Sequence, residues 1–174
     1  VLKETATNER YTIYVNEGLP IYMDLNRFKL INDTAGHSAG DQCLIQVTTL
    51  IESFIRNDDV LSRLGGDEFG LILKNCTQDS ALKITNKISQ AITDMKFNWD
   101  GCDYGLGISI GINPLSRNSQ DAADELRKAD LACYTAKDEG KSHIYTYHIS
   151  ISHLLTPFTS PSPIPSSPSK KTNH

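Results

Sequence analysis

The chain has 174 residues, of which 39% are hydrophobic, and its formal net charge is −4 at pH 7. This length and composition fit one folded domain with a terminal extension, and the acidic balance argues against wholesale binding to nucleic acid. The sequence holds no apolar run of about 18 residues and opens with no signal-peptide pattern, so we expect a cytoplasmic protein without a membrane span.

The cysteines are scattered singly along the chain, without a C-x-x-C pair. They are Cys43, Cys76, Cys102 and Cys133. This pattern favours reduced thiols packed in the core of a cytosolic protein over a zinc site or a disulfide framework.

The first half of the chain predicts an apolar strand followed by two helices. The strand covers residues 19–23 and ends at Asp24, and a carboxylate there would point out of the sheet edge, where ligand sites of α/β folds gather. The spacing of apolar residues then predicts a short helix that Asn26 caps and a glycine ends. A longer amphipathic helix opens at Ser38 and ends near residues 56–59.

An acidic, glycine-rich turn joins two short apolar runs at residues 60–64 and 69–73. Such runs predict a β-hairpin, because glycine accepts the positive φ that a tight turn needs. The tip would hold Asp67 and Glu68 beside two glycines, where backbone without side chains lets a ligand approach closely. The alternative is a solvated acidic turn.

The second half of the chain completes a mixed pattern of helices and strands. Its predicted elements are a helix over residues 81–95, a strand over 104–112, a helix that is apolar from residue 126 and ends at Gly140, and a strand over 144–147. The order βααββαβαβ is close to the split βαββαβ pattern, so we predict an α+β domain over residues 19–148. Residues 149–174 hold five of the seven prolines among many serines, which predicts a disordered tail.

Three motifs follow one another at characteristic separations. They are Asp24-x-x-x-Phe28-Lys29-x-x-Asn32-Asp33-x-x-Gly36-His37-x-x-Gly40-Asp41, Gly65-Gly66-Asp67-Glu68-Phe69, and Ala129-Asp130-x-Ala132-x-Tyr134-x-Ala136-Lys137-x-x-Gly140-Lys141. With these motifs the chain resembles the GGDEF family, the diguanylate cyclases. The resemblance implies a palm-like central sheet with flanking helices, as in nucleotidyl cyclases. It also implies a nucleotidyltransferase that acts as a homodimer and condenses two GTP into cyclic di-GMP and two pyrophosphates.

The resemblance implies a Mg²⁺ or Mn²⁺ site at Asp24, Asp67 and the carbonyl of Leu25. Hard cations suit phosphoryl transfer and prefer carboxylate and carbonyl oxygen. The two carboxylates can meet if their strands are neighbours in the sheet. By analogy with the family, Asp67 also serves as the general base for the ribose 3′-hydroxyl, with Glu68 as a second candidate ligand or base. Alternatively, the metal alone lowers the pKa of that hydroxyl.

Asn32 and Asp41 match the family positions that hold guanine. A carboxylate accepts hydrogen bonds from guanine N1–H and N2, a donor pair that adenine lacks, so such a site would select GTP over ATP. The alternative is a helix-surface asparagine and an acid near a helix N-terminus.

The phosphates are expected at the start of the first helix. The backbone of Asn26, Arg27 and Phe28, together with Lys29, would hold the β- and γ-phosphates, because a helix N-terminus offers N–H groups. Lys137 and Lys141 are spaced i, i+4, and the family uses basic residues there against the triphosphate. The alternative for this pair is solvated lysines at a helix end.

Arg56 and Asp59 match the R-x-x-D inhibitory motif that many GGDEF domains carry before the hairpin. An arginine can grip a phosphate or the Hoogsteen edge of guanine, and an aspartate can accept from guanine N1–H and N2. The motif therefore predicts product inhibition by cyclic di-GMP. Alternatively, both residues merely cap and solvate a helix end.

Three features depart from the family pattern. Lys141 takes the place of the usual arginine, which keeps the charge but loses the bidentate geometry. Many members have a second aspartate where this chain has Asn26. The usual opening Asp-x-Leu-Thr-Gly-Leu-x-Asn-Arg is missing from residues 1–18, which are polar and hold at most one marginal strand at 11–15. An active cyclase is therefore weighed against a degenerate domain that binds GTP or cyclic di-GMP as a receptor module. A different nucleotidyl cyclase or polymerase palm would not need the Asn32/Asp41 pair.

Overall fold

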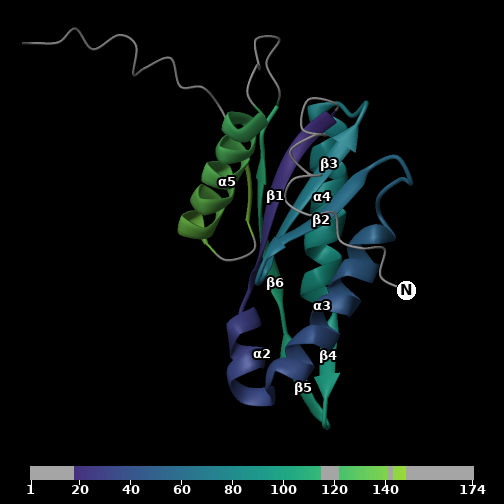
Figure 1. Ribbon diagram of the computed structural model, residues 1–174, viewed down its shortest axis with the longest axis vertical. Helices are drawn as coiled ribbons and strands as arrows, with labels where there is room; N and C mark the ends of the chain where they lie inside the picture. Colours follow the sequence, from purple (N-terminus) through teal and green to yellow (C-terminus); the bar gives the residue numbers. More distant parts are fainter. Residues whose placement is uncertain (1–17, 115–121, 141–142, 148–174) are drawn as a thin grey trace, which may run out of the picture.

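The computed structural model describes residues 18–114, 122–140 and 143–147 and shows a five-stranded sheet between helices (Figure 1). The elements in chain order are β1 (Gly18–Asn26), α2 (Phe28–Ala35), α3 (His37–Glu52), β2 (Val60–Gly65), β3 (Glu68–Lys74), α4 (Gln78–Asp94), β4 (Lys96–Trp99), β5 (Cys102–Gly105), β6 (Gly107–Ile112), α5 (Ala122–Glu139) and β7 (Ile144–Thr146). The predicted fold class, a central sheet flanked by helices, is confirmed.

The central strand of the sheet is β1. The strand order is β2-β3-β1-β6-β7, with β1 antiparallel to both β3 and β6 and with β7 parallel to β6. Strands β2 and β3 form the predicted hairpin, and an irregularity between Arg63 and Gly65 shifts its register. The hairpin strand that carries the acidic tip is therefore a direct neighbour of the strand that carries Asp24.

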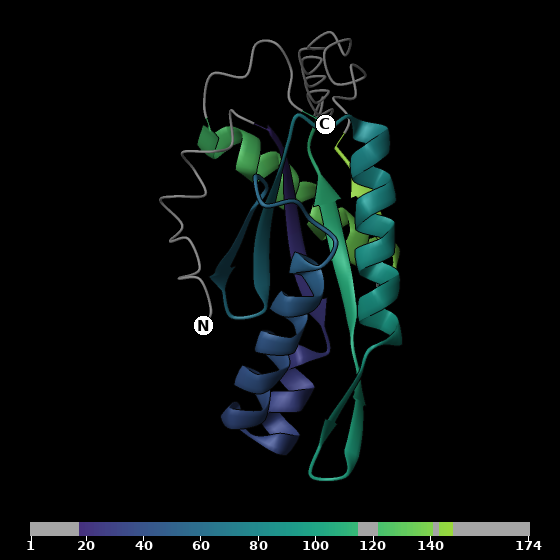
Figure 2. The same ribbon diagram turned by 90° about the vertical axis from the view of Figure 1, so that its right-hand side faces the viewer.

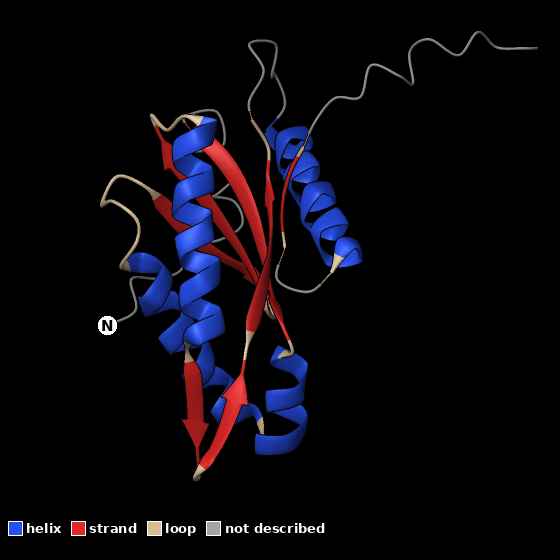
Figure 3. Ribbon diagram, turned by 180° about the vertical axis from the view of Figure 1, so that it is seen from behind, coloured by secondary structure: helices blue, strands red, loops and turns tan. Residues whose placement is uncertain are grey.

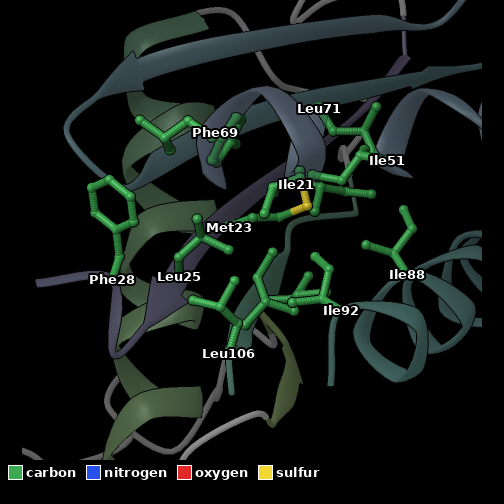
Figure 4. Packing of buried hydrophobic residues seen from close by; sticks show 14 of the residues in the cluster. Ile21, Met23, Leu25, Phe28, Ile51, Phe69, Leu71, Ile88, Ile92 and Leu106 are labelled. Atoms are coloured by element: carbon green, nitrogen blue, oxygen red, sulfur yellow. The ribbon is translucent and has the colours of Figure 1, made fainter. Parts of the chain in front are cut away.

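The apolar side of the sheet forms the main core. Alternation along β1 places Ile21, Met23 and Leu25 on this face, and all three are buried. Helices α3 and α4 cover the face, as Figures 2 and 3 show from two sides. Figure 4 shows Ile51 of α3 and Ile88 of α4 packed with these strand residues.

The opposite side of the sheet is covered by α5 alone among the described helices (Figure 3). The helix lies very close to β6 at Gly111. A Cβ built there would be 2.1 Å from the carbonyl oxygen of Ala129 and 2.2 Å from the backbone nitrogen of Cys133. Backbone atoms cannot move aside like a side chain, so a glycine at 111 is what allows α5 to pack against the sheet.

Gly111→Ala is therefore expected to destabilise the domain by about 3 kcal/mol, the upper range for overpacking a core. The free energy of unfolding in urea would measure the change. Gly105→Ala is the matched control, because a Cβ there meets no atom of the described residues within 4 Å. A Gly111→Ala variant as stable as the control would contradict the close packing of α5.

The structure corrects three predictions about the first elements of the domain. Strand β1 continues through Asn26, so Asp24 lies inside the strand and not at its end. The residue that precedes α2 is Arg27, in a left-handed conformation with φ 69°, so Asn26 is not the N-cap. The long helix α3 begins at His37 and already ends at Glu52, although Phe54 still packs against the core.

A predicted single strand over 104–112 is in fact two strands in different sheets. Strand β5 pairs with β4 in a separate hairpin, which extends from the same end of the molecule as α2 (Figure 1). The Asp100-Gly101 turn between alternating aromatic residues is a typical hairpin signal that sequence reasoning missed. The turn residues both have positive φ, 48° and 78°.

The four cysteines are unpaired, and two of them lie in the core as predicted. Cys43 and Cys133 are buried and Cys76 is half-buried, whereas Cys102 on the β4–β5 hairpin is exposed. The prediction that the cysteines pack in the core is therefore wrong for Cys102. The marginal strand at 11–15 and the tail at 149–174 lie outside the described residues. Within the described part of the chain, no helix is both long and apolar enough to cross a bilayer.

Candidate active site

The acidic hairpin tip lies against the centre of the sheet. Glu68 is the cross-strand partner of Asp24, and the backbone N–H of Leu25 donates to the carbonyl oxygen of Asp67 at 3.1 Å. Asp24 is only 8% exposed, whereas Asp67 and Glu68 are half-buried. The structure thus brings together the residues predicted to bind metal and to act as base, on the sheet face under α5.

A lysine from α5 forms an ion pair with one of these carboxylates. The Nζ of Lys137 lies 2.5 Å from the Oδ2 of Asp24. Burial raises the pKa of Asp24, Lys137 opposes that shift, and the nearby charges of Asp67 and Glu68 add to it. Desolvation is the largest single influence on Lys137 and lowers its pKa, but the hydrogen bond to Asp24 and the nearby negative charges together outweigh it, so the net pKa is raised. Lys137 therefore lies in the site, as the partner of a predicted metal ligand.

The donor atoms at this place fit a hard divalent cation. Magnesium is commonly held by one or two carboxylates, with water and substrate phosphates completing its shell. Asp24 and Asp67 supply the carboxylates, and Leu25 adds a backbone carbonyl. Among the described residues, no three His, Cys, Asp or Glu side chains form a ready metal cage. Two carboxylates and one carbonyl would leave the rest of such a coordination shell to water and substrate phosphates.

The two predicted guanine ligands come from adjacent helices. Helices α2 and α3 pack together, and a Cβ on Gly40 would lie 2.0 Å from the side-chain oxygen of Asn32. Asn32 thus lies against the residue that precedes Asp41 in the chain. Asn32 is half-buried and Asp41 is exposed, so a base could reach both.

The start of α2, where phosphate binding is predicted, has no side-chain cap from the described residues on its backbone N–H groups. Lys29 is exposed in the first turn of this helix. The side chain of Asn26 is engaged elsewhere: its Nδ2 lies 3.1 Å from the Oγ of Ser109, which in turn lies 3.3 Å from its Oδ1. Lys141, the second predicted basic residue, lies outside the described residues.

The R-x-x-D pair lies at the opposite side of the hairpin from its tip. The carboxylate of Asp59 accepts from the backbone N–H of Arg56 at 2.8 Å and from that of Lys74 at 3.0 Å. Asp59 therefore has the capping role that the alternative interpretation gave it, but at a turn and not at a helix end, because α3 already ends at Glu52. Arg56 is exposed, and with Asp59 it lines a pocket of about 270 Å³. The other lining residues are Asp58, Lys74 and Asn75.

Sequence reasoning missed three residues beside the carboxylates. Tyr22 shares a sheet face with Asp24, and burial followed by the charge of Glu68 raises its pKa far above the ordinary value. Ser109 is the cross-strand partner of Asp24 on β6. Cys133 of α5 donates to the carbonyl of Ser109 at 3.3 Å, and burial raises its pKa to about 12. The period-2 alternation of β1 and β6 could have identified the first two.

A palm-like sheet whose central strand lies beside an acidic hairpin tip defines the class of the GGDEF domain, and comparison with known proteins agrees. Residues 4–143 match the family described as "Diguanylate cyclase, GGDEF domain". The chain therefore belongs to the GGDEF family. It is 43% identical over 142 residues to the probable diguanylate cyclase DgcE of Escherichia coli K12, covering 82% of this chain and 12% of that protein.

Two further relatives show the range of the family. The chain is 36% identical over 126 residues to the cyclic di-GMP phosphodiesterase PdeB of Shewanella oneidensis, covering 72% of this chain and 15% of that protein. The crystal structure of the GGDEF domain of PA1120 from Pseudomonas aeruginosa superposes with a TM-score of 0.75 at 27% identity, covering 86% of this chain and all of that one. The chain thus spans a small part of the two curated relatives.

Proposed function

We propose that this domain is a diguanylate cyclase, which condenses two GTP into cyclic di-GMP and two pyrophosphates. The observation that carries the proposal is the meeting of Asp24 with the hairpin tip, through the Asp24–Glu68 pairing and the hydrogen bond between Leu25 and Asp67. Two carboxylates beside a lysine, near an uncapped helix start, form a place where a triphosphate and its cation could be held together.

In the proposed reaction, each of these residues has a defined role. The 3′-oxygen of one GTP attacks the α-phosphorus of the other, the bond to pyrophosphate breaks, and the hydroxyl proton passes to Asp67. A second condensation closes the ring: the 3′-oxygen of the second nucleotide attacks the α-phosphorus of the first, and a second pyrophosphate leaves. Lys137 would offset the negative charge of the triphosphate. A Mg²⁺ or Mn²⁺ ion held by Asp24, Asp67 and the Leu25 carbonyl would neutralise charge on the phosphate oxygens.

Recognition of guanine would fall to the helix pair α2 and α3. Asp41 accepts from N1–H and N2, and Asn32 bonds the remaining edge of the base. Incubation of the purified protein with GTP and Mg²⁺, followed by chromatography, tests the proposal directly. We expect cyclic di-GMP and pyrophosphate from GTP and no product from ATP. GTP that stays intact, with a folded domain at high protein concentration, would refute the proposed activity.

A receptor module is the second candidate, because one relative carries the name of a phosphodiesterase and because Asn26 takes the place of a common family aspartate. Such a domain would bind GTP or cyclic di-GMP without turnover. Calorimetry beside the synthesis assay separates the two candidates, since binding without synthesis favours the receptor.

We further propose that catalysis requires a homodimer. Each domain holds one GTP, and a product with two-fold symmetry needs two sites that face each other. Synthesis per subunit is expected to fall as the protein is diluted through its dimerisation range. Light scattering at each concentration would give the oligomeric state. A constant specific activity down to concentrations at which only monomer is present would contradict this requirement.

Product inhibition through Arg56 is a separate proposal. The exposed guanidinium lies at a pocket away from the hairpin tip, so cyclic di-GMP there need not displace GTP. Arg56→Ala is expected to weaken product binding about tenfold or more, the effect of losing a charged hydrogen-bonding partner, and to relieve inhibition without lowering the initial rate. Lys87→Ala removes an exposed cation from α4 and serves as control. Calorimetry that shows equal product affinity in Arg56→Ala and wild type would refute the assignment of Arg56 to product binding.

A further inference from the structure

Ser109 occupies a junction between three parts of the active site. Its backbone pairs with Asp24, its side chain bonds Asn26 at the end of β1, and its carbonyl accepts from Cys133 of α5. The residue is completely buried, with 0% exposure. No role in the reaction described above uses its hydroxyl.

The hydrogen bonds between Asn26 and Ser109 run diagonally across the sheet. The direct partner of Asn26 on β6 is Gly107, which has no side chain, and Ser109 is the next residue on the same face. The amide of Asn26 therefore leans along the strand and meets the Ser109 hydroxyl at 3.1 and 3.3 Å. Diagonal neighbours on one sheet face are close enough for side chains to interact, and such cross-strand pairs stabilise the sheet.

The residue after Asn26 is in a conformation that needs support. Arg27 has φ 69° and ψ 9°, in the left-handed region that is unfavourable for a residue with a Cβ. Such a conformation persists only where the surrounding structure holds it. Phe28, the buried first residue of α2, anchors the chain on one side, and the N–H of Leu30 donates to the carbonyl of Arg27 at 3.1 Å. The Asn26–Ser109 contact anchors it on the other side.

We propose that Ser109 is a positioning residue for the substrate phosphates: through Asn26 it holds the left-handed turn at Arg27, and thereby directs the first N–H groups of α2. The inference rests on the proposed function for its ligand, a nucleoside triphosphate. The hydroxyl of Ser109 bonds the side chain of Asn26, and its proposed role is therefore indirect. It acts through the backbone that follows Asn26, and its link to Cys133 keeps that backbone in register with the helix that carries Lys137.

Ser109→Ala tests the proposal, because it removes the hydroxyl and keeps the strand. Titration with a non-hydrolysable GTP analogue and Mg²⁺ is expected to show roughly three- to tenfold weaker binding, the range that one lost hydrogen bond produces. The KM for GTP should rise by a similar factor, with kcat within about twofold of wild type. Asn26→Ala should weaken binding similarly, and the double variant should be no weaker than Asn26→Ala alone.

Hydrogen exchange of the ligand-free protein provides an independent readout. Amides of residues 27–29 should exchange faster in Ser109→Ala than in wild type. The matched control is Thr85→Val, which removes another completely buried hydroxyl, on α4. Unchanged exchange at residues 27–29, additive effects of Ser109→Ala and Asn26→Ala, or an equal effect of Thr85→Val would each overturn the proposal. A wild-type domain that binds the analogue but makes no cyclic di-GMP would refute only the cyclase activity.

Discussion

Asp67→Ala is expected to abolish cyclic di-GMP synthesis while the domain stays folded. The carboxylate is half-buried at a hairpin tip, so its removal affects little packing. Its loss would remove both the proton acceptor and one of the two proposed metal-binding carboxylates. We expect a decrease in turnover of about a thousandfold or more, which corresponds to about 4 kcal/mol of transition-state stabilisation, a range that a metal ion can supply.

The measurement for Asp67→Ala is the rate of pyrophosphate release from GTP, with circular dichroism to verify the fold. Asp103→Ala is a matched control, because it removes an exposed carboxylate from the other hairpin, where Asp103 accepts a surface hydrogen bond from Asn98. We expect the control to retain wild-type turnover. If a folded Asp67→Ala protein made cyclic di-GMP at the normal rate, the assignment of the hairpin tip to the chemistry would be wrong.

Lys137→Ala is expected to change two properties in opposite directions. Turnover should fall by about a hundredfold, because the triphosphate loses a cationic partner in a partly desolvated site. The affinity of the nucleotide-free protein for Mn²⁺ should rise about tenfold. The Nζ of Lys137 lies 2.5 Å from Asp24 and competes with a cation for the same carboxylate, and removal of that competitor leaves Asp24 more attractive to a metal.

Electron paramagnetic resonance of free Mn²⁺ would measure that affinity without any turnover. Arg127→Ala is the control on the same helix, because Arg127 forms an exposed ion pair with Asp124 away from the carboxylate cluster. We expect Arg127→Ala to leave both Mn²⁺ binding and synthesis unchanged. A Lys137→Ala protein that binds Mn²⁺ more weakly than wild type would show that Lys137 does not compete with the metal.

Local patterns in the sequence were sufficient for the family and for the order of elements except the β4–β5 hairpin. The β2–β3 hairpin follows from glycines between two apolar runs, and the helices follow from apolar residues at three- and four-residue spacing. The three motifs were sufficient for the resemblance to the GGDEF family, since each depends on residue types at short separations. The missed β4–β5 hairpin also carried a local signal, the Asp-Gly turn at 100–101.

Contacts between distant strands and helices were decided only by the tertiary structure. Asp24 looked like a strand end, because the pairing that extends β1 to Asn26 comes from β6, more than eighty residues later in the chain. The ion pair of Lys137 with Asp24 depends on how α5 crosses the sheet, and that crossing depends on close backbone approach at Gly111. Periodicity shows which face a residue is on, but only register and packing determine which side chain lies opposite it. The candidate residues could thus be identified from the sequence, but the contacts that bring them together in one site could not be predicted from it.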